Sequence, residues 1–128
     1  MKKPKLTCKK EISFGSDYGY TLKKYRYMDE DGRLRVLVES YKYKHQPEKN
    51  YETERRMDEY GRVTYSRKND VETYIGYCNT DGTGEDRYNQ CRVKIKRGDV
   101  WIEKCLNKDG DIVVITTSDE IVKSVDTL

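Results

Sequence analysis

The amino-acid sequence predicts an all-β fold, an antiparallel meander of about nine strands that forms a sandwich or a strongly curled sheet or barrel. Composition is the first reason: alanine, the best helix former, is absent from the 128 residues, whereas Val, Ile, Thr and Tyr are plentiful. Short segments with alternating side chains are the second reason, and recurring turn phrases between them are the third. At this length the chain is expected to form one β domain, residues 1–128.

A four-residue phrase with Asn or Asp first and Gly last is the clearest internal regularity. The Asx side chain accepts hydrogen bonds from the backbone two residues on, and glycine adopts positive φ without strain. The phrase therefore suits a type I turn that closes into a G1 bulge, and we expect each copy to be a hairpin tip. The four copies lie at 29–32, 58–61, 79–82 and 107–110.

Nine segments of β character lie around these tips, and most connections between them are short enough for a meander. The predicted strands are 5–14, 20–28, 33–43, 51–57, 62–67, 71–78, 87–96, 100–106 and 112–117.

A short helix is predicted at the C-terminal end of the sequence. Ser118 is a suitable N-cap, and the two residues after it are acidic, which favours a helix N-terminus. Ile121, Val122 and Val125 then fall on one helical face.

The hairpin around Arg97-Gly98 is predicted to turn on these two residues. In that register opposite charges meet on one face and four aliphatic residues share the other face. The predicted pairs are Lys96 with Asp99, Lys94 with Trp101, and Arg92 with Glu103.

The hairpin built from 20–28 and 33–43 changes its apolar side halfway. Val36 and Val38 share one face, whereas Tyr41 and Tyr43 share the other. A β-bulge, or a long bent hairpin whose two ends pack on different layers, would explain the change, and the sequence does not choose between them.

Catalytic and metal-binding patterns are missing from the sequence. The single imidazole, His45, lies in a polar loop, and the four cysteines do not form the close pairs that zinc sites use. The acidic turn phrases do not continue to the bidentate glutamate of a calcium loop. We therefore expect no catalytic residue, no metal and no cofactor, although an enzyme that uses carboxylates stays open as a third hypothesis.

Compartment is predicted from the absence of an export signal or transmembrane run: no apolar stretch follows the basic start of the sequence. The expected location is cytoplasmic, with reduced thiols and no membrane partner. In an oxidising setting, Cys78 and Cys91 would be the pair to bond, because they flank a predicted hairpin.

Tyrosine is concentrated in one part of the chain, and 11 of the 12 tyrosines lie between positions 18 and 77. Tyr side chains interleaved with cations suit a protein-binding hot spot, and they also suit stacking with single-stranded nucleic acid. We predict a non-enzymatic interaction module that binds a protein partner, as an inhibitor or accessory subunit, with nucleic-acid binding as the alternative. The candidate residues are Tyr25, Arg26, Tyr27, Tyr41, Lys42, Tyr43 and Lys44.

Two considerations weigh against this binding prediction. The same tyrosines can instead form the core of a half that is poor in aliphatic residues. The net charge of only +3 is also low for a dedicated phosphate binder.

Residues 27–34 and 57–63 resemble single units of the tyrosine–aspartate repeats found in large bacterial shell-forming toxins. The four turn glycines are 29, 21 and 28 residues apart, whereas a repeat family keeps a constant period. The resemblance therefore implies shared hairpin chemistry rather than membership of that family.

Overall fold

The computed structural model describes residues 5–15, 19–118 and 122–124 of the chain, and of the last three only the backbone. The described residues form ten strands and a single short 3₁₀ turn. The chain divides into two compact units, residues 1–69 and 70–128. Strands within each unit pair in sequence order, and these pairings are antiparallel. The predicted all-β meander is confirmed, while the assignment of residues 1–128 to one domain stays a prediction.

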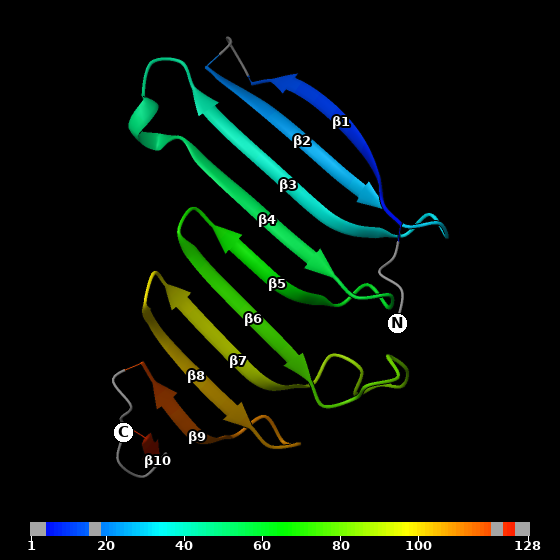
Figure 1. Cartoon of the computed structure of the whole chain (residues 1–128), viewed down its shortest axis with the longest axis vertical. Helices are drawn as coiled ribbons and strands as arrows, with labels where there is room; N and C mark the ends of the chain where they lie inside the picture. Colours follow the sequence, from blue (N-terminus) through cyan, green and yellow to red (C-terminus); the bar gives the residue numbers. More distant parts are fainter. Residues whose placement is uncertain (1–4, 16–18, 119–121, 125–128) are drawn as a thin grey trace. The chain divides into compact units, whose positions relative to one another are not determined.

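The first unit is a five-stranded meander in which β1 is bordered by β2 alone (Figure 1). A 3₁₀ turn, η2 (Pro47–Lys49), lies in the connection between the third and fourth strands. The strands are β1 (Thr7–Phe14), β2 (Tyr20–Met28), β3 (Leu34–Tyr43), β4 (Tyr51–Met57) and β5 (Val63–Lys68).

The second unit is a further meander, coloured from green to red in Figure 1. Residues 78–89 connect its first two strands. The strands are β6 (Val71–Tyr77), β7 (Gln90–Arg97), β8 (Val100–Leu106), β9 (Ile112–Thr117) and β10 (Val122–Ser124).

All nine predicted strands are present, with ends that differ by three residues or fewer. The predicted C-terminal helix is wrong where it can be compared, because Val122–Ser124 form β10 and pair with β9. Nucleating a short helix is unfavourable, whereas the edge of β9 offers backbone hydrogen bonds to an extended segment. The remaining helix residues, 119–121 and 125, lie outside the described part of the chain. Neither unit closes into a barrel through any pairing among the described residues.

Three of the four turn phrases form the predicted tips. In the tip at 58–61, Oδ1 of Asp58 accepts hydrogen bonds from the backbone N–H groups of Tyr60 and Arg62, each at 2.9 Å. Gly61 has φ +82°, and the strand register shifts beside the tip, as a G1 bulge requires. The tips that begin at Asp29 and Asn107 repeat these bonds. The phrase at 79–82 instead opens the longer connection between β6 and β7.

The hairpin between β7 and β8 turns one residue later than predicted. Arg97 pairs with Val100, so the two-residue turn is Gly98-Asp99. The reason is conformational: Gly98 has φ +59°, which the first turn position of a type II′ hairpin requires and Arg97 would adopt only with strain. The predicted pairs are therefore wrong, although the division of residues between the two faces is right.

The hairpin between β2 and β3 contains no bulge at its centre. Its pairing runs without a shift from Tyr20 opposite Tyr43 to Tyr27 opposite Val36, and the single irregularity lies beside the tip. Of the two explanations that the sequence leaves open, a β-bulge at the middle of the hairpin is therefore wrong. The change of apolar side instead places large side chains on both faces of the hairpin.

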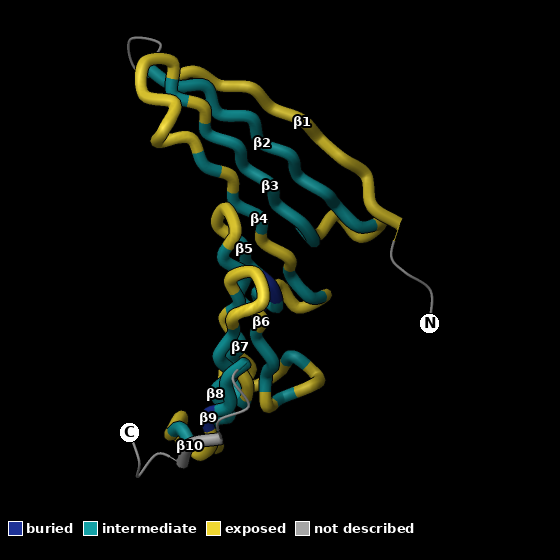
Figure 2. Tube along the Cα trace, turned by 60° about the vertical axis from the view of Figure 1, so that its left-hand side comes forward, coloured by how far each residue is buried: buried dark blue, intermediate teal, exposed yellow. Residues whose placement is uncertain are grey.

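Burial is low throughout the two units (Figure 2). Among the described residues, only Tyr65, Ile115 and Arg62 are buried, at 7%, 5% and 5% exposure. A single layer of strands leaves both faces partly open, so cross-strand side-chain pairs must supply much of the stabilisation.

Candidate functional site

The predicted binding residues lie on two adjacent strands, but the strand register divides them between two faces. Tyr41 and Tyr43 pair with Leu22 and Tyr20, whereas Tyr25 and Tyr27 pair with Val38 and Val36. Directly paired residues share a face, and successive residues alternate. The sets are Tyr41, Tyr43 and Arg26 on one face and Tyr25, Tyr27 and Lys42 on the other, with Lys44 just after the end of β3.

Four tyrosines from three strands gather on the first of these faces, which we name the tyrosine face. The rings of Tyr41 and Tyr51 stack at a centroid distance of 4.5 Å and an interplanar angle of 14°. Tyr20 lies 6.2 Å from Tyr41 and 5.6 Å from Tyr43. All four side chains are half-buried, so each ring keeps part of its surface open to solvent.

A cation completes this cluster. The ammonium of Lys68 lies 4.9 Å from the centroid of the Tyr51 ring, and Lys68 itself is exposed. An ammonium over an aromatic face is attracted by the ring quadrupole. The tyrosine face therefore combines partly open aromatic surface with positive charge, and of the residues predicted from the sequence it contains Tyr41 and Tyr43 in this cluster.

Tyr20, Tyr51 and Lys68 were missed by the sequence reasoning. A usable signal existed: Tyr20 and Tyr51 begin their strands, and Tyr43 ends the strand between them. In a meander the end of one strand adjoins the start of the next, which brings these three positions to the same end of the unit.

A half-buried carboxylate borders the tyrosine cluster. Glu39, whose side chain is 12% exposed, lies 3.9 Å from Lys24 and 3.6 Å from Arg55, and it accepts a 3.1 Å hydrogen bond from the Tyr41 hydroxyl. Burial, reinforced by the bond to Glu39, raises the pKa of Tyr41 to about 12. The hydroxyl therefore stays protonated near neutral pH and keeps donating to the carboxylate.

The opposite face of the first unit uses its rings for packing. The guanidinium of Arg56 lies 4.3 Å from the centroid of the buried Tyr65 ring. Lys10 lies 5.7 Å from the Tyr25 ring. The hydrogen bond with Cys8 is the main cause that raises the pKa of Tyr27. Tyr65 is therefore buried within its own unit, whereas Tyr25 and Tyr27 are half-buried like the tyrosines of the other face.

A shallow hollow of about 430 Å³ lies at one end of the first unit. Three of the predicted residues line it together with the exposed Phe14 and with Thr21. The three are Lys42, Tyr43 and Lys44.

The structure also shows where the possible metal ligands and the cysteine thiols lie. Within residues 5–15, 19–118 and 122–124, no group of three or more His, Cys, Asp and Glu side chains is placed to hold a metal ion. His45 lies in the exposed segment after β3. Cys78 and Cys91 are free thiols in side-chain contact, and burial, followed by the hydrogen bond to Cys91, raises the pKa of Cys78.

In the part of the chain that the structure describes, no helix is long and apolar enough to cross a membrane.

Comparison with known proteins finds no family model that matches the chain and no matching curated protein.

Proposed function

We propose that the chain is a non-enzymatic interaction module that binds a protein partner through the tyrosine face, as an inhibitor or accessory subunit. The observation that carries the proposal is the gathering of Tyr20, Tyr41, Tyr43 and Tyr51 on one open face with Lys68 beside them. Tyrosine is enriched at protein-binding hot spots because its ring buries a large apolar area while its hydroxyl keeps a polar contact.

Charge favours a protein over a nucleic acid as the partner. On the tyrosine face Glu39 engages Lys24 and Arg55, and Glu11 forms an ion pair with Arg26. Cations that already face carboxylates contribute less to phosphate binding than a patch of one sign would.

The chemistry of the partner follows from the surface that surrounds the rings. The exposed cations Lys44, Lys49 and Lys68 belong to the strand ends and connection beside the tyrosines. A protein surface with an apolar centre and an acidic rim complements this arrangement.

The test is affinity capture from the native source followed by titration of the captured protein in purified form. Tyr43 and Tyr51 stand at the end of β3 and the start of β4, so Y43A/Y51A removes two rings without interrupting a strand. We expect the double variant to weaken binding at least about thirtyfold, since each hot-spot truncation costs about 1 kcal/mol or more.

The matched control is Y74A, which removes a 40% exposed tyrosine from the second unit. Binding of the control within about twofold of wild type is expected. Equal weakening by both variants, or no weakening by Y43A/Y51A, contradicts the proposal.

Single-stranded nucleic acid is the second candidate, favoured by Lys68 over the Tyr51 ring and by the rings open for base stacking. Fluorescence anisotropy with an oligothymidine probe at 50 and 200 mM salt separates the two. Binding that falls steeply with salt and is lost in Y43A/Y51A supports this candidate, and the absence of binding at low salt excludes it.

A further inference from the structure

The strand β1 is the outermost strand of the first unit, and among the described residues its edge away from β2 pairs with no other strand. All eight of its residues are exposed, and Ile12 and Phe14 are 50% and 63% exposed (Figure 2). Its pairing with β2 runs through eight positions with no shift or bulge. A long regular edge strand without proline is a template for a further strand.

The outward hydrogen-bonding groups of β1 can be assigned from the hairpin end. The N–H of Gly15 donates to the carbonyl of Tyr20 at 2.9 Å, so these two residues form a hydrogen-bonded pair. Such pairs alternate along an antiparallel ladder, and the odd-numbered residues of β1 therefore face β2. The outward N–H and C=O groups on which the pairing depends belong to Cys8, Lys10 and Ile12.

The sequence of this edge is self-complementary about Lys10. Reading outward in both directions from Lys10, each residue meets one of matching or complementary chemistry. The matched positions are Lys9 and Glu11, Cys8 and Ile12, Thr7 and Ser13, and Leu6 and Phe14.

We propose that two copies of the chain associate by antiparallel pairing of β1 with β1 across a two-fold axis at Lys10. Cys8, Lys10 and Ile12 of one copy then exchange about six backbone hydrogen bonds with Ile12, Lys10 and Cys8 of the second copy. The residues with outward groups meet one another in this register, as ladder geometry requires.

Side chains favour this register over its neighbours. Lys9 lies opposite Glu11 of the second copy, so that each Glu11 carboxylate is shared between this lysine and Arg26 of its own chain. The two-fold axis forms this Lys9–Glu11 pair twice. A shift of the axis by one residue in either direction places Lys9 opposite Lys9 or Glu11 opposite Glu11, which is repulsive. Among these three registers, only the one centred on Lys10 places opposite charges across from each other.

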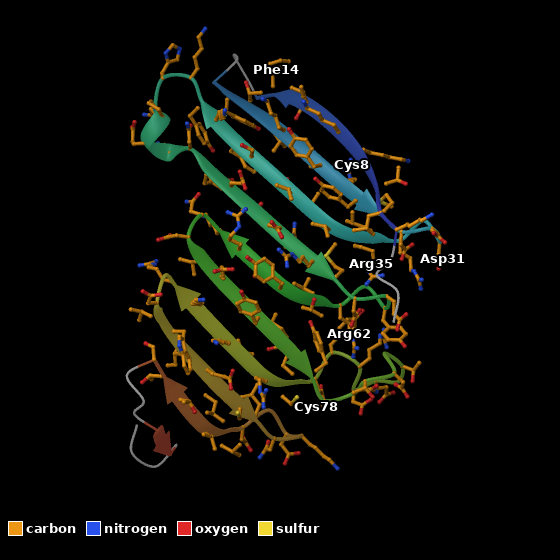
Figure 3. The ribbon with its side chains drawn as sticks, in the orientation of Figure 1. Cys8, Phe14, Asp31, Arg35, Arg62 and Cys78 are labelled. Atoms are coloured by element: carbon orange, nitrogen blue, oxygen red, sulfur yellow. The ribbon has the colours of Figure 1, made fainter. Side chains whose placement is uncertain are left out.

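The two Lys10 side chains are the unfavourable element at the axis. In the structure the Lys10 ammonium extends over Tyr25 on its own chain, at 5.7 Å from the ring centroid. The charge is thereby held over β2 and away from the open edge. Cys8 and Phe14 lie toward the two ends of the strand (Figure 3), and Phe14 meets Leu6 of the second copy.

The first test measures the mass of the full chain by sedimentation equilibrium from 1 to 300 μM. Ile12→Pro removes an outward N–H that the pairing with β2 does not use, whereas Ile12→Thr keeps that N–H and a β-branched side chain. We expect dimers for wild type and I12T and monomers for I12P. A monomeric wild type, or an I12P variant that dimerises like wild type, overturns the proposal.

The second test does not depend on whether I12P folds. Lys9→Glu places carboxylates opposite Glu11 of the second copy, and Glu11→Lys added to it restores opposite charges. We expect K9E to weaken dimerisation about tenfold and K9E/E11K to recover to within about threefold of wild type. Dimerisation unchanged in K9E, or not recovered in the double variant, overturns the β1 register. Circular dichroism of each variant checks that the strands remain.

Discussion

The two units share one turn chemistry but stabilise their strands with different side chains. In the first unit, charged side chains cover aromatic rings and bridge strands, as Arg56 does over Tyr65 and Glu39 does between Lys24 and Arg55. In the second unit, a cation also lies over a ring, as Lys94 does over Trp101, but the opposite face adds aliphatic pairs across the strands, as Ile95 does with Ile102.

The difference shows two ways to stabilise a single layer of strands. A long cationic side chain buries its methylene groups against a ring and keeps its charge in water. A β-branched side chain instead packs against its cross-strand neighbour and leaves its outer side exposed. The stability of the first unit should therefore depend most on charged side chains, and the stability of the second unit on side-chain volume.

The largest expected effect tests the first unit at its two Asp-x-x-Gly-Arg tips. Asp58 binds Arg62 at 2.7 Å, and Arg62 (labelled in Figure 3) is 5% exposed, whereas the side chain of Arg33 beside Asp29 is 47% exposed. D58A should reduce the free energy of unfolding by about 3 kcal/mol, because a buried cation loses its carboxylate. D29A should cost about 1 kcal/mol.

Urea denaturation of both variants measures the difference. Each variant loses the same two backbone hydrogen bonds to the Asx side chain, but D29A also separates Asp29 from two arginines, Arg33 and Arg35, both more exposed than Arg62. Equal losses would show that the buried pair at Asp58 adds no more stability than the two more exposed pairs at Asp29.

The next effect tests the second unit by volume. Ile115 is 5% exposed, so I115A should reduce the free energy of unfolding by about 2 kcal/mol. V100A removes a residue that is 69% exposed and should change stability by less than about 0.5 kcal/mol. Hydrogen exchange resolved by unit should place the loss from I115A among the amides of residues 70–118. A comparable loss from V100A would contradict the aliphatic packing.

Local chemistry made much of the fold predictable. The Asx side chain and the positive-φ glycine act within four residues, so the tips at Asp29, Asp58 and Asn107 could be located before any pairing was known. The same rule, applied to Gly98, would have corrected the turn that was placed at Arg97. The charge pairs favour a turn at Arg97-Gly98, whereas the positive φ of the first turn position requires glycine there.

The candidate site was less predictable because it depends on pairing between strands. Tyr25 and Tyr41 carry the same sequence pattern, yet the register places them on opposite faces. Alternation within one strand says which residues share a side, but only the partner strand says which sides coincide. The C-terminal helix was lost for a related reason, since the edge of β9 is not visible in the local sequence.

A smaller effect concerns the hydroxyl at the border of the tyrosine face. Y41F removes the donor to Glu39 and should reduce the free energy of unfolding by about 1 kcal/mol. The folded-state pKa of Tyr41, about 12, lies above the ordinary value near 10. Its contribution to stability is therefore complete below pH 10 and lost as the pH rises toward 12. In a pH titration followed by tyrosine absorbance, Y41F should lack the tyrosine that ionises at the highest pH. An unchanged titration curve would assign the pKa of about 12 to another tyrosine.

The smallest effect returns to the turn that both units share. Backbone N–H groups, first that of Arg33 and then that of Asp31, hold the pKa of Asp29 below its ordinary value. A depressed folded-state pKa means that the contribution of Asp29 is present above about pH 4 and is lost as the pH falls through the folded-state value. Carboxyl carbon NMR should show Asp29 titrating below a free aspartate.

Asn107 supplies the comparison, because it makes the same two backbone bonds with an amide oxygen that does not titrate. D29N should therefore keep the tip folded while removing its dependence on acid, as judged from the amide shifts of residues 29–33 between pH 2 and pH 6. If the D29N tip opens at neutral pH, the tip needs the ion pair between the Asp29 carboxylate and Arg33 as well as the acceptor oxygen. The two units would then differ even in their turns.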